Sequence, residues 1–383
     1  QVNELMQQLV SLANNVLVIT APEKEKDALP QTEVWENFFS WVRTVEMEPY
    51  RTEKIDRPLL SEEITSGRVV KTKKGKYGST VWMLKNGIRV VVLPTADSPY
   101  QIVMNGQASG GLSMVPTEDY YSASMLAQLV SASGVGDFTA EQLRKVLGGK
   151  AVNVQPVINR FSTDINGSAA KGDVETMLQL TYLYFTRPNF DRGRFDMMIA
   201  ANRMNLENSV NSPDFMMTQM VNKVTYGDQP RTQIPNEQIL AGIDFDKIAS
   251  WYRNLFTDAA GNYTFYFVGD IDMETFKPLV EKYIGGLPRG RQRLAWKDDG
   301  VRVLPGMKEE RQEIRMETAR SMVSLAYSGE MEYTQQNMMT LGMLSACLQS
   351  RYNQVIREEK GGSYGVSVNG VLSRQPIGMY DLK

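Results

Sequence analysis

The densest local signal in the chain is Ile356-Arg357-Glu358-Glu359-Lys360-Gly361-Gly362-Ser363-Tyr364-Gly365-Val366. It predicts a helix with Arg357 near its C-terminal end, a sharp turn at Gly361 and Gly362, and a strand that opens at Tyr364. Arg357 and Tyr364 then flank one tight turn and can point into one cleft. A guanidinium and a phenol both donate hydrogen bonds, so the pair can hold a peptide backbone and stabilise the oxyanion of amide hydrolysis. On the residues alone, the favoured explanation of the stretch is a glycine-capped helix with a surface arginine and a tyrosine at the edge of the core.

Outward from this stretch, strands and helices alternate as in an α+β protein. Strands at Val81–Leu84 and Ile88–Leu93 flank Asn86-Gly87 and predict a β-hairpin. Further expected strands cover about 101–108, 151–156, 160–168, 263–268, 313–327, 364–371 and 377–382, and expected helices include 117–133, 172–186, 190–209, 244–256, 272–283 and 334–348. The pattern predicts antiparallel sheets packed with helices in two successive domains.

The first 47 residues look like the end of another domain. Val16-Leu17-Val18-Ile19 predicts a buried strand, and an apolar stripe over Glu33–Val45 predicts a helix. An earlier helical face is formed by Leu5, Met6, Leu9, Val10 and Leu12. The polar stretch 48–78 predicts a linker. Because the first residue is Gln1 and not Met, we expect a processed or partial chain, with any targeting signal outside it.

Composition narrows the classes of function. The chain has 383 residues, which is too long for one ordinary core, and its 42% hydrophobic and 22% charged residues are typical of a globular protein. The net charge of -2 offers no basic face for nucleic acid. The lysine cluster at 71–76 is interpreted as part of the solvated linker. No apolar run approaches the ~18 residues that span a bilayer, so we expect no membrane span.

The chain contains no histidine and one cysteine. These counts exclude histidine general bases, Ser-His-Asp and Cys-His arrangements, and zinc sites built from His or several Cys. Carboxylate-bound cations remain possible, but no loop has calcium-site spacing. We therefore expect no metal in this chain. Cys347 lies in a Met- and Leu-rich helical stretch and is predicted to be a buried apolar residue.

The stretch 356–366 resembles the C-terminal signature of the pitrilysin (M16) family of zinc peptidases, in which an Arg and a Tyr are separated by the same short glycine-bearing turn. Leu84–Leu93 is similar to the family's domain-opening hairpin, and Tyr263–Tyr283 is similar to the strand, turn and helix that open its second domain type. The resemblance covers nearly the whole chain. It implies two M16-type (LuxS/metallohydrolase-like) domains, 79–240 and 241–383, the second incomplete. Residues 1–47 would end the N-terminal half and 48–78 would connect the halves.

The resemblance also implies where the chemistry resides. Members of the family close two homologous halves around a peptide, and an H-x-x-E-H helix of the first half binds Zn²⁺ and supplies the general base. Here that pattern falls on Ser124-Met125-Leu126-Ala127-Gln128, so both ligands and the base are absent. Ala200 and Ala201 occupy the region expected for a distal Glu ligand. The resemblance thus implies a non-zinc half that encloses peptide and supplies Arg357 and Tyr364, with Zn²⁺ in the N-terminal half.

Three functions remain open. The first is a peptidase half, whose N-terminal counterpart is either on the same polypeptide, as the partial first domain favours, or on a partner chain. The second is a non-catalytic binding or scaffold subunit of the same fold, and retention of Arg357 and Tyr364 argues against it. A Ser/Lys hydrolase ranks last, because no Ser and Lys share a strand–turn–helix context. Several large bacterial members are exported, so we expect the periplasm or cell envelope of a bacterium.

Overall fold

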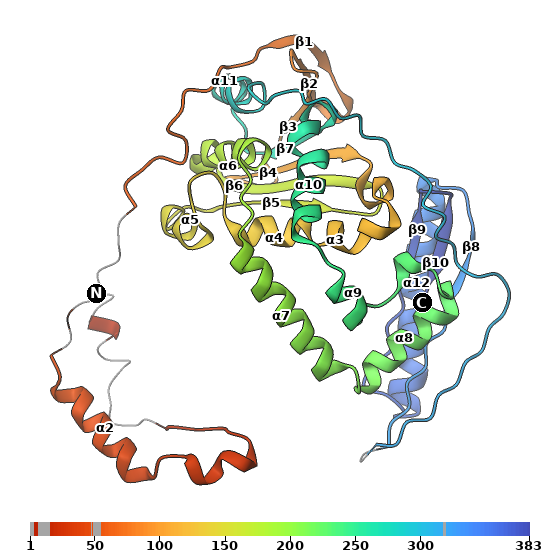
Figure 1. The fold of residues 1–383 in the computed structure, drawn as a ribbon. Coiled ribbons are helices and arrows are strands. Elements are labelled where there is room, and N and C mark those ends of the chain that lie inside the picture. The colour runs from red at the N-terminus through yellow and green to blue at the C-terminus, as the bar shows by residue number, and fades with distance from the viewer. Residues whose placement is uncertain (1–3, 7–15, 47, 49–54, 317–318) are drawn as a thin grey trace. The chain divides into compact units, whose positions relative to one another are not determined.

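The computed structural model describes residues 4–6, 16–46, 48, 55–316 and 319–383, and the chain divides into two compact units after residue 54 (Figure 1). The first unit contains η1 (Glu23–Ala28) and α2 (Thr32–Thr44), which confirms the helix predicted at 33–45. Val16–Ile19 forms no strand and is exposed, so the predicted buried strand is wrong. Among the described residues of this unit there is no strand with which it could pair. Of the helical face predicted at Leu5, Met6, Leu9, Val10 and Leu12, the first two residues are helical and exposed, and the other three lie outside the described residues.

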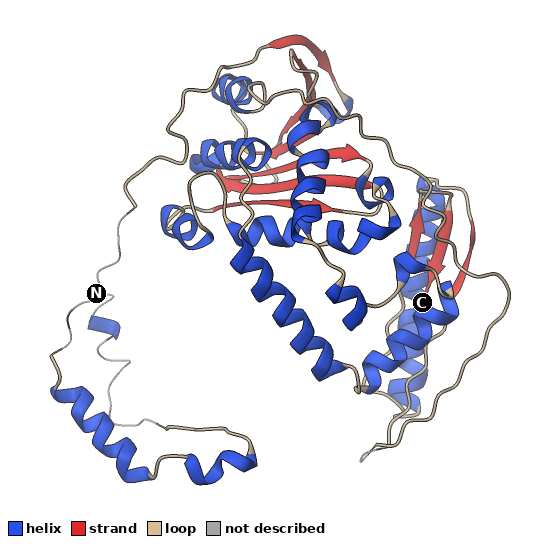
Figure 2. Ribbon diagram, viewed as in Figure 1, coloured by secondary structure: helices blue, strands red, loops and turns tan. Residues whose placement is uncertain are grey.

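Seven strands of the second unit form one sheet in the order β1-β2-β3-β7-β4-β6-β5. Every neighbouring pair is antiparallel except β3 and β7, which run parallel. A small antiparallel sheet has the order β8-β10-β9. Figure 2 shows both sheets in red. The bounds are β1 Val69–Lys74, β2 Thr80–Leu84, β3 Arg89–Pro94, β4 Gln101–Ser109, β5 Val152–Ile158, β6 Ser162–Ala170, β7 Thr264–Gly269, β8 Tyr327–Glu330, β9 Gly370–Ser373 and β10 Met379–Leu382.

Helices cover one side of the large sheet, and several begin at a side-chain cap. Asp244 and Thr334, for example, accept hydrogen bonds from the backbone N–H groups of Lys247 and Asn337, as N-cap residues do. The α-helices are α3 Tyr120–Ser124, α4 Leu126–Ser133, α5 Ala140–Val146, α6 Val174–Thr186, α7 Arg192–Ser209, α8 Pro213–Tyr226, α9 Glu237–Ala241, α10 Phe245–Leu255, α11 Met273–Tyr283 and α12 Gln335–Tyr352. The α+β class with helix-packed, mainly antiparallel sheets is confirmed.

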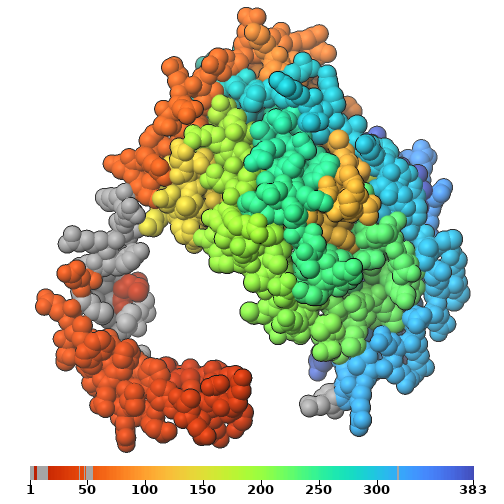
Figure 3. All heavy atoms as spheres, in the orientation of Figure 1, coloured from red at the N-terminus to blue at the C-terminus, as the bar shows by residue number. Residues whose placement is uncertain are grey.

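The core lies between these helices and one face of the sheet. Along β4, exposed and buried residues alternate, as expected of a strand with one covered face. Phe265 and Phe267 of β7 are fully buried among residues of α4, α6, α10 and α11. Val103, Tyr266 and Val268 point to the other face and are 47%, 41% and 39% exposed. The helix-covered side faces the viewer in Figure 3, where α6 to α10 appear in green. The opposite face of the sheet is therefore open.

The predicted domain borders do not follow this sheet. Strand β1 lies within the predicted linker 48–78, pairs with β2, and follows Ile64, which is buried. Strand β7 lies beyond the border predicted at 240/241, yet it pairs with β3 and β4. One body with a continuous core therefore extends from about Ile64 to Leu287. The sequence pattern locates each strand but contains no information about which distant strand it pairs with.

Three lysines of the predicted linker lie on β1, an edge strand of the large sheet. Lys71, Lys73 and Lys74 are all exposed there. Charged side chains on an edge strand discourage its open hydrogen-bonding groups from pairing with another chain. The cluster is solvated, as predicted, but it belongs to the sheet.

The C-terminal elements are shorter than predicted. Among the described residues of the strand expected near 313–327, only Tyr327 lies in a strand. Tyr364 opens no strand, and β9 begins at Gly370. Pairing of β10 with β8 and β9 involves four residues on each strand, which fixes these lengths. Cys347 is exposed, so its predicted burial is wrong. Helix α12 buries Leu341 and Ser345, and Cys347 lies on another part of its surface.

We predict losses of stability of very different size for substitutions at two adjacent residues of β7. Phe265→Ala removes a ring from the packed face and should reduce the free energy of unfolding by about 3–5 kcal/mol. Tyr266→Ala, on the open face, should cost about 1 kcal/mol or less. Urea denaturation of both variants measures the difference. Equal losses would contradict a sheet with one open face.

Candidate functional site

The turn that carries Arg357 is built at the end of a long helix. Helix α12 continues as a π-helical stretch, η8 (Asn353–Glu359), which contains Arg357. The N–H of Gly361 donates to the carbonyl of Arg357 at 3.2 Å, and the N–H of Gly362 donates to that of Ile356 at 2.9 Å. Gly361 has a φ of +59°, which favours glycine, whereas Gly362 has no positive φ. The predicted glycine turn is present, and Gly361 provides its unusual conformation.

Two amide side chains hold the segment after this turn against the helix. The N–H of Val366 donates to Asn353 Oδ1 at 3.2 Å, and the N–H of Val368 donates to Gln349 Oε1 at 2.6 Å. Gln349 Nε2 also donates to the carbonyl of Val366. Gln349, Asn353 and Arg357 are spaced four residues apart, so they lie on one side of the helix. The spacing of Gln349 and Asn353, two amides four residues apart on the predicted helix, is the sequence pattern from which these positioning residues could have been predicted.

The structure places Arg357 and Tyr364 on either side of the turn without joining them. Arg357 is exposed, and the side chain of Tyr364 is fully exposed. No hydrogen bond links the two side chains in the described part of the chain. Ser363 Oγ accepts from the N–H of Gly365 at 3.2 Å and shapes the backbone around Tyr364. Both donors are thus available to a ligand.

The helix predicted at 117–133, which would carry the zinc motif, is divided into two short helices in the structure. Helices α3 and α4 meet at Met125, and Ser124 Oγ donates to the carbonyl of Tyr121 at 2.7 Å at the end of α3. Ala127 is half-buried and Gln128 is exposed. No group of three or more His, Cys, Asp or Glu side chains that could hold a metal occurs among the described residues. Ser124, Ala127 and Gln128 therefore do not fit Zn²⁺.

An ionic contact attaches this region to α10. Asp119, just before α3, accepts from Lys247 Nζ at 2.5 Å and from Trp251 Nε1 at 2.9 Å. The hydrogen bond from the Lys247 ammonium lowers the pKa of Asp119 below its usual value of 3.8, although desolvation acts in the opposite direction. Ser122 Oγ accepts from the N–H of Asp244 at 3.0 Å. These contacts give α3 a structural role.

Part of the chain matches a known protein family. Residues 242–379, which include the Arg357 turn, match the family model described as Peptidase M16 inactive domain. This part of the chain is therefore similar to the M16 inactive domain. The predicted relationship to the M16 family is therefore confirmed.

Two curated relatives extend this match. A "Zinc protease PQQL-like" of Arabidopsis thaliana is 24% identical over 364 residues, covering 91% of this chain and 35% of that protein. A "Probable zinc protease PqqL" of Haemophilus influenzae is 19% identical over 373 residues, covering 94% and 39%. The chain thus spans little more than a third of the length of these relatives.

The fold agrees with a solved structure. The periplasmic protease PqqL from Escherichia coli superposes with a TM-score of 0.70 at 17% identity, over 94% of this chain and 40% of that one. The second unit and its sheets therefore have an M16 peptidase fold. The described residues include no helix that is both long and apolar enough to cross a membrane.

The ion pair between Asp119 and Lys247 predicts that the stability of the fold depends on pH. Because the pKa of Asp119 is lowered on folding, its contribution to stability is present above pH 3.8 and is lost as the pH falls through the lowered value. The variant D119N should be less stable than the wild type at neutral pH, and the two should converge in acid. Urea midpoints across this range measure the effect. A difference that is independent of pH would contradict the ionic role.

Proposed function

We propose that this chain is the non-zinc half of a zinc metallopeptidase, in which it encloses a peptide substrate and supplies Arg357 and Tyr364. The observation that carries the proposal is the M16 inactive-domain match, because it includes the exposed Arg357–Tyr364 turn. The relatives named as zinc proteases support the reaction class. The H-x-x-E-H half would be on the same polypeptide or on a partner chain.

In this proposal the two side chains act as hydrogen-bond donors. Arg357 presents a planar, permanently charged guanidinium that suits a peptide carbonyl. Tyr364 donates a hydrogen bond from its phenol O–H to the oxygen that becomes negatively charged as the amide carbonyl is attacked. Gln349 and Asn353 hold the backbone at Val366 and Val368, just after Tyr364, which keeps the segment that carries the phenol close to the helix. A scaffold subunit would have no use for this arrangement.

Zinc chemistry is assigned to the other half. There, bound Zn²⁺ would activate the attacking water. The residues of this chain do not fit the ion at Ser124, Ala127 and Gln128, so this chain is proposed to be inactive alone. We also propose a periplasmic location, because the solved relative from Escherichia coli is described as periplasmic.

The roles of the turn can be tested in the complete protein. Arg357→Ala or Tyr364→Phe should lower kcat for peptide cleavage about a hundredfold, the loss typical of a missing oxyanion donor. Lys360→Ala, which removes a neighbouring charge from the same turn, should leave kcat within about twofold. Zinc content should not change in any variant. Wild-type turnover by both Arg357→Ala and Tyr364→Phe would refute the assigned roles.

The 383-residue chain alone should bind no stoichiometric zinc and cleave no peptide, since it has no histidine. Elemental analysis after dialysis against zinc, together with a fluorogenic peptide assay, provides the measurement. Zinc-dependent cleavage by the isolated chain would overturn the division of labour between the two halves.

A further inference from the structure

The open face of the large sheet carries a row of amide side chains. The strand register places Val91, Tyr266, Asn105, Asn166 and Gln155 side by side across β3, β7, β4, β6 and β5. Asn105 Nδ2 donates to Asn166 Oδ1 at 2.7 Å, which ties the centre of the row together. A primary amide has two donor hydrogens and an acceptor oxygen, so Asn105, Asn166 and Gln155 keep hydrogen-bonding capacity for a ligand.

The neighbouring rows carry apolar as well as polar side chains and little charge, with Val103 and Val268 paired on one side of the amide row. Gln107 Nε2 donates to Asp164 Oδ1 at 2.8 Å, and Asp164 Oδ2 also accepts from Asn159 and Ser162. Asp164 is 3% exposed, so its carboxylate is occupied and withdrawn from solvent. Asn153 on β5 is exposed. The centre of the face thus offers amides rather than free charges.

One end of this face is bordered by an arginine-rich segment, Arg289–Arg293. The carbonyl of Arg289 accepts from the N–H of Gly261 at 2.7 Å, and the carbonyl of Gln292 accepts from Asn262 Nδ2 at 2.9 Å. Both partners lie just before β7. Further along, the N–H of Trp296 donates to Ser109 Oγ at the end of β4. Because β4 and β7 are antiparallel, these contacts fix the segment along a single end of the sheet.

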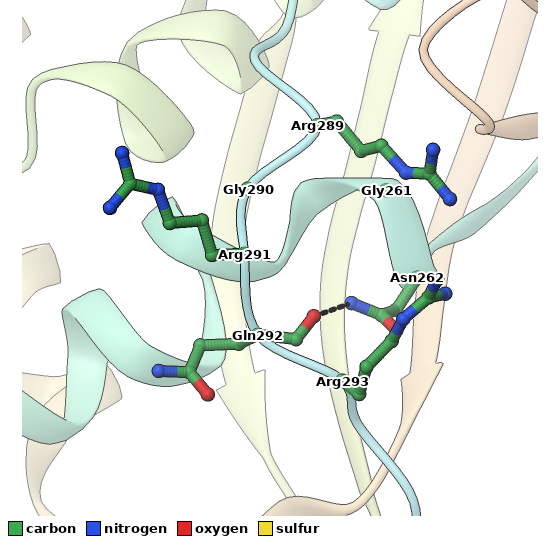
Figure 4. Close-up of a pocket in the computed structure, with 7 residues that line it drawn as sticks. All are labelled: Gly261, Asn262, Arg289, Gly290, Arg291, Gln292 and Arg293. Atoms are coloured by element: carbon green, nitrogen blue, oxygen red, sulfur yellow. Dashed lines mark hydrogen bonds between the residues drawn. The ribbon is translucent and has the colours of Figure 1, made fainter.

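The arginines of this border have no acidic partners. Arg289, Arg291 and Arg293 line a cavity of about 260 Å³ with Gly261, Asn262, Gly290 and Gln292. Figure 4 shows Arg289 and Arg293 extending to one side of the segment and Arg291 to the other. Arg89, the first residue of β3, lies opposite Thr264 at the same end. Within the described residues, none of these four arginines forms an ion pair.

The acids that follow in sequence are already paired. Asp298 accepts from Arg302, and Asp299 accepts from Arg160. No carboxylate of the described chain therefore neutralises Arg289, Arg291 and Arg293. Unpaired guanidinium groups at one end of the sheet, together with the amide row, are complementary to a chain that combines peptide groups with carboxylates.

We propose that the open sheet face and its arginine border bind an extended, acidic stretch of polypeptide. Peptide N–H and C=O groups would meet the amide row, and Asp or Glu side chains would meet the arginines. The inference rests on the proposed function, because it assigns a substrate class to the peptidase. It places the binding of unfolded acidic segments on this chain, apart from the Arg357 turn.

The same chemistry fits nucleic acid less well. Stacking of bases on aromatic rings is a main source of binding energy for single strands. Tyr266 is the only aromatic side chain in the amide row. An acidic polypeptide is therefore the favoured occupant.

Direct binding tests this proposal without requiring catalysis. A fluorescein-labelled peptide of alternating Glu and Ser, with counterparts that carry Gln or Lys in place of Glu, is titrated with the 383-residue chain, and anisotropy is recorded at low and moderate salt. The variant R289Q/R291Q/R293Q should bind the Glu peptide about tenfold more weakly, the sum of three partly exposed ion pairs. K71Q/K73Q/K74Q removes the same charge from β1 and should bind like the wild type.

A second variant tests the amide row. N153A/Q155A alters two exposed side chains of β5 and should weaken binding of both the Glu and Gln peptides about threefold. If the triple arginine variant fails to fold, as judged by circular dichroism, R293Q alone should still weaken binding of the Glu peptide and spare the Gln peptide.

Three results would overturn the inference: equal affinity for the Glu and Lys peptides, equal weakening by the arginine and lysine variants, or tighter binding of single-stranded RNA. Each would leave the proposed peptidase role intact, because that role is judged by the turnover of the Arg357 and Tyr364 variants. Conversely, unchanged turnover in those variants would refute their role and leave the measured binding in place.

Discussion

The insertion of β7 between β3 and β4 is the constraint on which the rest of the second unit depends. It joins the hairpin β2–β3 to β4, β6 and β5, and it delivers Phe265 and Phe267 into the core. At its end, Gly269 has a φ of +142°, and a Cβ there would lie 2.1 Å from the carbonyl oxygen of Gln101. Glycine is therefore required for β7 to close against β4. Helices α10 and α11, before and after β7, are placed by the same insertion.

Helices α3 and α4, on which the resemblance predicts a degenerate zinc motif, are held in place by packing. Leu126, Leu129 and Val130 of α4 are fully buried and contribute to the core. Ser124 and Gln128, the positions that would carry metal chemistry, are exposed and do not pack in the core. Packing therefore preserves the helix positions, whereas the outward residues can change without loss of fold.

The two proposed substrate contacts depend on different kinds of structure. The Arg357 turn is local: a glycine with positive φ and two amide side chains one helical turn apart hold it. The open sheet face is assembled from strands far apart in sequence, so its amide row exists only after β7 has paired. A border of unpaired arginines adds long-range attraction for acidic chains, which favours encounter, whereas the turn would act at the reacting bond.

The sequence by itself determined the absence of a histidine metal site, the Asn86-Gly87 hairpin, the helix ending at Gly361 and the resemblance to the M16 family. These features follow from residue type and from patterns within a few residues, where turn chemistry and periodicity operate. Only the tertiary structure decided that the large sheet spans the predicted border through β7, that Gln349 and Asn353 hold the Tyr364 segment, and that Cys347 is exposed. Strand pairing and exposure depend on contacts between residues distant in the chain, and local patterns do not encode them.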